Sequence, residues 1–151
     1  MKKISLVFVL VMLLLVTGCG NKTKEVKSLN DFYNVASGKE LIVSDNMGSY
    51  TADYIKEAMV ASKDDLSIEM IAYDTEDSAS TVQDSNIDAF MTRKSTNAVI
   101  KKEKGENYYK YTMITNGYYL VSSRVDNTLI IVNTPVKNKD LVDSVLDSLG
   151  Y

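Results

Sequence analysis

The chain has 151 residues, with 17 basic and 20 acidic side chains, one cysteine and no histidine. Without histidine it lacks both the usual general base at neutral pH and imidazole ligands for a metal, and one cysteine cannot form a disulfide within the chain. The acidic balance, with no basic stripe, excludes the electrostatic signature of a nucleic-acid-binding protein.

The first eighteen residues differ in composition from the rest. Lys2 and Lys3 precede an apolar run over residues 4–16 that only Ser5 interrupts. A basic start, a short apolar run and small residues before a cleavage point are typical of a secretory signal; a bilayer-spanning helix needs roughly 20 apolar residues. Residues 1–18 are therefore predicted to be a signal peptide. Their removal leaves 15 basic and 20 acidic side chains, a net charge of −5, and enough chain for one domain with a core.

The only cysteine closes the segment Val16-Thr17-Gly18-Cys19. An aliphatic residue at −3, a hydroxylated one at −2 and glycine at −1 resemble the lipobox of bacterial lipoproteins, although leucine is commoner than valine at −3. In that family the cysteine thiol receives a diacylglyceryl group, the signal is cut before the cysteine, and the new N-terminus is often acylated. The resemblance implies that Cys19 is the lipidation site and the first residue of the mature protein, with no thiol left for nucleophilic catalysis.

Lipid on Cys19 would attach the protein to a membrane, since two or three acyl chains give lasting anchorage at about 0.8 kcal/mol per buried CH₂. Residues 19–28 are predicted to be this lipidated N-terminus and a polar tether, because GNKTKEVKS has no apolar period to bury. Abundant Lys, Asn, Asp and Tyr without Trp is typical of Gram-positive proteins. We therefore expect the protein on the outer face of the cytoplasmic membrane.

The first half of the remaining chain predicts a βαβ unit. Apolar residues at helical spacing indicate a helix over residues 29–36, with Ser28 as N-cap. Residues 40–44 (ELIVS) predict a buried strand, and residues 66–73 a second one. Between them, a helix is predicted from Ser49 or Thr51 to about residue 62. Strand, helix and strand at this spacing favour a right-handed crossover between parallel strands.

The middle of the chain carries weaker signals. Residues 74–85 are polar and predict at best a weak helix that Asp74 or Thr75 caps, and residues 86–92 (NIDAFMT) predict a third short strand. The segment of residues 74–84 is rich in acidic side chains, but it lacks the ligand spacing and the glycine of a calcium-binding EF-hand, so a solvated loop is favoured. Residues 94–107 contain a basic cluster and Gly105, and predict a short helix followed by a loop; the cluster is Lys101, Lys102 and Lys104.

The clearest local signal is Asn116-Gly117 between two β-prone runs, which predicts a hairpin with a two-residue turn. Such a turn pairs Ile114 with Tyr119 and Met113 with Leu120. It also assigns the side chains to two faces. The predicted core face has Tyr109, Tyr111, Met113 and Leu120, and the more mixed face has Tyr108, Lys110, Thr112, Ile114, Tyr119 and Val121.

The C-terminal segment completes the predicted fold. A second tight turn at Asp126-Asn127 leads into residues 129–132, whose apolar character on both faces predicts a central strand covered on both sides. A helix from Asn138 to Gly150 has one apolar stripe. We therefore predict a single α+β domain over residues 29–151, with mixed α/β as an alternative. It has a βαβ unit, an antiparallel three-strand meander and a C-terminal helix packed on the sheet.

Two places are candidate sites. The predicted strand-to-helix junction could bind a ligand, since strand ends and helix N-termini converge there; a simple capping turn is the alternative. Its residues are Asp45, Asn46, Gly48, Ser49 and Tyr50. Tyr108 and Tyr119 could form an interaction surface, because tyrosine gives large contact area at low entropic cost; strand packing is the alternative.

One wider resemblance concerns KELIVSDNMGSYTADYIKEAM, IEMIAYD and DSNIDAFMT. These segments resemble the first lobe of an extracytoplasmic solute-binding protein, which implies the order strand, helix, strand and short strand. The chain is too short for the two lobes of that family, so its ligand site is not carried over.

Together these patterns predict a membrane-anchored, extracytoplasmic lipoprotein that binds an envelope protein or glycan. No S-x-x-K motif occurs and the acidic residues are scattered, so we predict no enzymatic activity, cofactor or metal. The alternative is a reduced solute-binding module that captures a small ligand near residues 45–50. The first hypothesis requires an exposed, tyrosine-bearing patch, and the second requires a closed pocket near Gly48.

Overall fold

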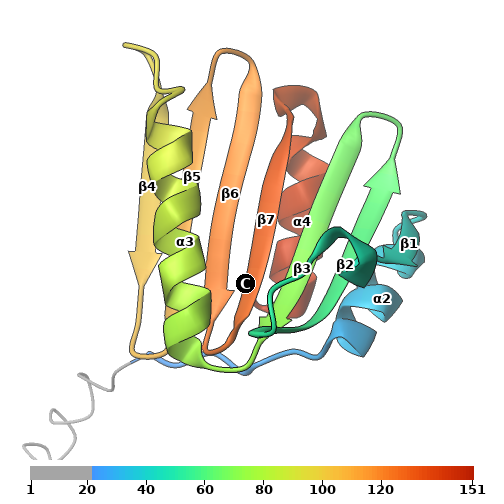
Figure 1. Cartoon of the computed structure of the whole chain (residues 1–151). Coiled ribbons are helices and arrows are strands. Elements are labelled where there is room, and N and C mark those ends of the chain that lie inside the picture. The colour runs from blue at the N-terminus through green and yellow to red at the C-terminus, as the bar shows by residue number, and fades with distance from the viewer. Residues whose placement is uncertain (1–21) are drawn as a thin grey trace, which may run out of the picture.

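The computed structural model describes residues 22–151, which form one antiparallel sheet with helices on both faces (Figure 1). The strands lie in the order β1-β2-β3-β7-β6-β5-β4. The strand bounds are β1 Ile42–Asp45, β2 Ile55–Lys63, β3 Leu66–Tyr73, β4 Val99–Lys104, β5 Tyr108–Thr115, β6 Tyr118–Val125 and β7 Thr128–Pro135. The helices are α2 Leu29–Gly38, α3 Glu76–Met91 and α4 Lys139–Leu149, with 3₁₀ turns η1 Met47–Ser49 and η2 Val136–Asn138. The predicted α+β class is confirmed.

Two meanders build the sheet. The first is β1-β2-β3, and helix α3 then carries the chain to the far edge, where β4 begins the second meander. Strand β7 ends that meander beside β3, so the two halves join at the centre. We call the end of the sheet with the turns at residues 105–107 and 126–127 the lower end, and the end with the turns at 64–65 and 116–117 the upper end.

The two faces have separate cores. On the α4 face, α2 and α4 cover apolar side chains that include Ile68, Met70 and Ile130. On the α3 face, helix α3 covers Tyr111, Met113 and Leu120. The loop after β1 completes the α3 face lower down, because Met47, Tyr50 and Ala52 pack on a cluster around Ile55, Ala58, Ile71 and Tyr73.

The hairpin prediction is confirmed residue by residue. Ile114 pairs with Tyr119 and Met113 with Leu120. Asn116 and Gly117 both have positive φ, as a type I′ turn requires. Strand β7 is central and covered on both sides, with Leu129 and Ile130 fully buried. The C-terminal helix packs on the sheet and ends at the left-handed Gly150.

The βαβ unit is wrong. Residues 49–62, predicted as a helix, contain only the end of η1 and most of strand β2, which pairs antiparallel with both β1 and β3. The turn at Asp64-Asp65, where Asp64 has a φ of 52°, joins β2 directly to β3 as a hairpin. A short apolar segment can match the spacing of a helix and that of a strand equally well. Here the hydrogen bonds with β3 stabilise the strand. The resemblance to a solute-binding lobe therefore does not extend to the fold.

Three further predictions for the chain before the β5-β6 hairpin need correction. Residues 86–92 are not a strand but lie largely in α3, because Thr75 caps a helix whose buried stripe continues to Phe90. Residues 99–104 form strand β4 instead of a short helix. The strand predicted at residues 40–44 exists as β1, yet it is a sheet edge rather than buried, and Ile42 is 74% exposed.

Residues 22–28, which we call the N-terminal strap, lie along the lower end of the sheet before entering α2 (Figure 1). They have no regular secondary structure, but they bind the domain through Asn107. This part of the predicted polar tether at residues 19–28 is therefore in contact with the domain. The predicted signal peptide and Cys19 lie outside the described residues. Within residues 22–151, no helix is both long and apolar enough to cross a membrane.

Candidate functional site

A groove of about 500 Å³ lies on the α4 face, between helix α4 and the outer strands β4 and β5. It exists because α2 and α4 cover the central strands and leave the outer part of this face open, while α3 lies on the opposite face. The floor carries Val99, Lys101 and Glu103 of β4, Lys110, Thr112 and Ile114 of β5, and Tyr119 of β6; the wall carries Lys139, Asp143 and Asp147.

The wall follows from the helical repeat of α4. Lys139, Asp143 and Asp147 are spaced by four residues, so they lie on one side of the helix, facing the groove. Val142, Val145, Leu146 and Leu149 are buried on the other side. The floor follows from strand alternation, since Lys101 pairs with Thr112 and Glu103 with Lys110 on the same face.

The upper part of the groove holds a fixed polar network. The Tyr119 hydroxyl donates to Asp143 Oδ1 at 2.7 Å, and Lys139 forms an ion pair with the same carboxylate. Burial, followed by the contact with Asp143, raises the pKa of Tyr119. Burial alone would raise the pKa of Asp143, but the hydrogen bonds from Lys139 and Tyr119 outweigh it and lower the pKa. Asp143 is therefore a stable anion.

The lower part of the groove holds the partly buried amine of Lys110. Its Nζ donates to the main-chain oxygen of Tyr151 at 3.0 Å. Burial lowers the pKa of Lys110, and the positive charge of Lys24 adds to this effect. Burial disfavours the charged form of this amine, so a further hydrogen-bond acceptor that enters the groove would stabilise the ammonium.

The groove thus presents both signs of charge and hydrogen-bonding groups on a partly apolar floor. That combination can form hydrogen bonds and ion pairs with a polar partner. Within residues 22–151, three or more aspartate, glutamate or other metal-binding side chains do not come close enough together to hold a metal ion.

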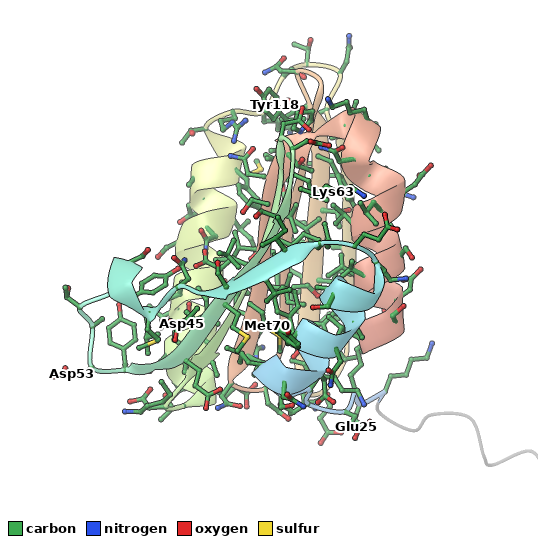
Figure 2. All side chains as sticks on the ribbon, turned by 90° about the vertical axis from the view of Figure 1, so that its right-hand side faces the viewer. Glu25, Asp45, Asp53, Lys63, Met70 and Tyr118 are labelled. Carbon is green, nitrogen blue, oxygen red and sulfur yellow. The ribbon has the colours of Figure 1, made fainter. Side chains whose placement is uncertain are left out.

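The polar side chains of the predicted ligand loop, residues 45–50, are hydrogen-bonded to one another and to Glu69. Tyr50 donates to Glu69 of β3 at 2.6 Å, and Asn46 donates to the same carboxylate. Ser49 donates to Asn46 Oδ1, and the Met47 N–H donates to Asp45, both at 2.7 Å. The structure does bring these residues together, on the α3 side of the sheet (Figure 2). However, no helix of the predicted kind starts there, and a Cβ at Gly48 would meet only open space.

The tyrosine prediction is also corrected. Tyr108 and Tyr119 are each only 4% exposed, so they do not form a broad exposed patch, although Tyr119 contributes to the floor of the groove. Tyr108 lies under Lys24 of the strap, and Tyr119 lies against α4. Tyr118, which the sequence reasoning did not select, is 41% exposed at the upper end, where Arg93 lies over its ring.

The sequence reasoning missed the groove residues for a simple reason. The pattern around Lys101 predicts a helix rather than an edge strand, and no local motif singles out Asp143. Two signals do point to this site: the mixed character of the face with Lys110 and Thr112, and the candidate residue Tyr119, which lies in the groove floor.

No protein-family model matches the chain, and no curated protein matches it. Two solved structures are distantly similar. One is a GTP-binding regulator from Thermotoga maritima, with 17% identity and a TM-score of 0.49, covering 84% of this chain and 90% of that one. The other is the extracellular domain of PknH from Mycobacterium tuberculosis, with 10% identity and a TM-score of 0.39, covering 87% and 99%. At these values, neither likeness bears on what this chain binds.

Proposed function

We propose that this chain is a lipid-anchored, extracytoplasmic lipoprotein whose domain binds an extended segment of another envelope protein. The lipobox-like segment ending at Cys19 supports the anchor. The observation that carries the binding role is the groove beside β4, because it joins a mixed-charge cleft to an open sheet edge.

The edge strand supports a protein segment as the partner. β4 is the last strand of the sheet, and among the described residues no strand pairs with its outer side. An exposed edge accepts an added strand through main-chain hydrogen bonds. Three of the six residues of β4 are lysines, which discourage pairing between copies of the same edge. An acidic segment is the complementary occupant, because it would relieve the repulsion among these lysines.

The small-ligand alternative has little support from the geometry. The polar groups of residues 45–50 are used by one another and by Glu69, so they do not converge on an open space. A glycan partner remains an outcome of the binding experiment below.

The anchor is tested with Cys19→Ala in the full-length chain expressed in a Gram-positive host. We expect fatty-acid labelling to disappear, and the protein to leave the membrane fraction or persist as the unprocessed precursor. Lipid labelling that persists in the variant would show that Cys19 is not the attachment site.

The binding surface is tested by photo-crosslinking in cells, with a photoreactive residue at Lys101 or, as control, at Asp77 on the exposed side of α3. A discrete adduct with an envelope protein is expected only from Lys101. Lys101→Glu should weaken capture from a photoreactive residue at Thr112 several-fold, and Lys56→Glu on the first meander should not. Equal adducts from both positions, or an adduct with glycan alone, would contradict the proposed partner.

A further inference from the structure

The N-terminal strap is held to the lower end of the sheet at two consecutive sites. The main-chain oxygen of Lys22 accepts from the N–H of Glu106 at 3.0 Å. The Lys24 N–H donates to Asn107 Oδ1 at 2.9 Å, and Asn107 Nδ2 donates back to the Lys24 oxygen at 2.8 Å. The Asn107 amide therefore satisfies the backbone of the strap as a neighbouring strand would.

Side chains reinforce this attachment. Lys24 Nζ lies 4.5 Å from the centre of the Tyr108 ring and 3.6 Å from Glu103. The chain passes so close to Gly105 that a Cβ there would lie 2.2 Å from the Lys22 oxygen and 2.1 Å from the Tyr108 ring. Only glycine permits this approach.

The other end of the strap is fixed as well. Ser28 and Asp31 form a reciprocal capping box at the start of α2, and Leu29 is buried directly after it. Residues 22–28 are therefore bound at both ends, which differs from a free tether.

The strap has a geometric consequence for the anchored protein. Only Gly20 and Asn21 separate Cys19 from Lys22. Three Cα-to-Cα steps span at most about 11 Å. Strands β5 and β6 each have eight residues, so the two ends of the sheet are roughly 26 Å apart. Glu25 of the strap and Tyr118 lie at opposite ends (Figure 2).

We infer that the lower end of the domain, with the turns at residues 105–107 and 126–127, is the surface that faces the lipid headgroups. The strap sets this orientation. The upper end, with Tyr118 and the 116–117 turn, points away from the membrane, and the β4 edge stands upright beside its groove. A partner on the same membrane reaches that edge from the side. This inference rests on the proposed lipidation of Cys19.

The orientation is tested in the processed, full-length lipoprotein reconstituted in phospholipid vesicles. The one native cysteine carries the lipid in the processed protein, so a fluorophore reacts only with an introduced thiol. One label is placed at Glu106→Cys in the 105–107 turn of the lower end, and the other at Thr96→Cys, next to Ser95, whose N–H binds Thr115 at the upper end. Lipids with a nitroxide on the headgroup serve as short-range quenchers. We expect several-fold stronger quenching at residue 106 than at residue 96. Equal quenching of vesicle-bound protein would overturn the inference, whereas failure to acquire lipid would overturn the proposed anchor instead.

The role of the strap is tested with two matched glycine variants. Gly105→Ala places a Cβ against the strap, whereas Gly48→Ala meets nothing within 4 Å. The difference in quenching between the two labels should collapse in Gly105→Ala and persist in Gly48→Ala. Asn107→Ala, which adds no bulk, should also reduce the difference, and circular dichroism checks that each variant is folded. A full difference in both folded strap variants would show that the strap does not set the orientation.

Discussion

Lys110 is the residue whose burial is hardest to explain by stability alone. Burial lowers its pKa, so the charged amine costs free energy in the folded state. Lys110→Met keeps the apolar stem and removes that cost, so the free energy of unfolding should stay within about 0.5 kcal/mol of wild type or rise. Capture of the partner from a photoreactive residue at Lys101 should fall several-fold. Urea unfolding measures the stability and the crosslinking yield measures the capture, with Lys56→Met as the exposed control. A large loss of stability in Lys110→Met would show that Lys110 has a structural role instead.

Asp143 makes the opposite contribution, because its pKa is lowered in the fold. Burial opposes this shift, but the hydrogen bonds from Lys139 and Tyr119 overcome it. A carboxyl group whose folded pKa is lowered stabilises the fold above its unfolded pKa of about 3.9, and the effect is lost as pH falls through the folded pKa.

Asp143→Asn should therefore lower the free energy of unfolding by about 1 kcal/mol at pH 7. The difference from wild type should shrink as the pH falls below about 4. Urea titrations of both proteins from pH 7 to pH 3 measure this, with Asp140→Asn as the control. A difference that stays constant over this range would contradict the stabilising role of the carboxylate.

At the scale of elements, α3 is joined to the sheet by a buried polar bridge rather than by apolar packing alone. Gln83 is 1% exposed, and its Nε2 donates to the main-chain oxygens of Tyr109 and Ser122 at 2.7 and 3.1 Å. Its Oε1 accepts from Arg124 Nε at 3.2 Å, and Arg124 also forms an ion pair with Glu76 of α3. The bridge therefore links the helix to both β5 and β6.

Gln83→Leu should leave these backbone oxygens and the Arg124 guanidinium short of partners, at a cost of about 2 kcal/mol in the free energy of unfolding. Chemical denaturation of Gln83→Leu and of Thr81→Ala, an exposed position on the same helix, provides the comparison. The control should change by no more than about 0.5 kcal/mol. Equal stability of the leucine variant and wild type would mean that packing alone holds α3.

The elements also show what the sequence can reveal about this fold. The β5-β6 hairpin and α4 were predicted with their register and boundaries because local chemistry decides them: Asn116-Gly117 fits only one kind of turn, and Gly150 ends a long apolar stripe. Strand β2 was missed because its identity depends on pairing with β3 and β1, which no local pattern encodes. The aspartates at 64–65 are the only local trace of that hairpin.

The groove shows the same limit. Its wall comes from α4 and part of its floor from β4. These two elements are about 35 residues apart in sequence and come together only in the folded protein. By contrast, residues 45–50 were predicted as a site because the sequence indicates a helix directly after β1. That helix does not form, and Met47 and Tyr50 of this loop instead pack on the lower α3 face. Lipidation at Cys19 stays a prediction, since that residue lies outside the described part of the chain.

For the whole molecule, the strap should contribute to stability as well as to orientation. It covers Tyr108, which is 4% exposed, and its hydrogen bonds to Asn107 reach across to the second lower turn, because Asn107 also donates to Asp126. A soluble form that begins at Ser28 should therefore unfold at a free energy about 1–3 kcal/mol below that of a form that begins at Lys22.

Urea unfolding of the two soluble forms measures this difference, and Asn107→Ala in both supplies the control. The truncation should cost less in the Asn107→Ala background, because the hydrogen bonds that it removes are already lost. A free tether predicts instead that both lengths are equally stable in both backgrounds, since an unbound polar segment buries no surface. The two-by-two comparison therefore separates a bound strap from a tether without any membrane present, and it leaves the question of lipidation to the Cys19→Ala experiment.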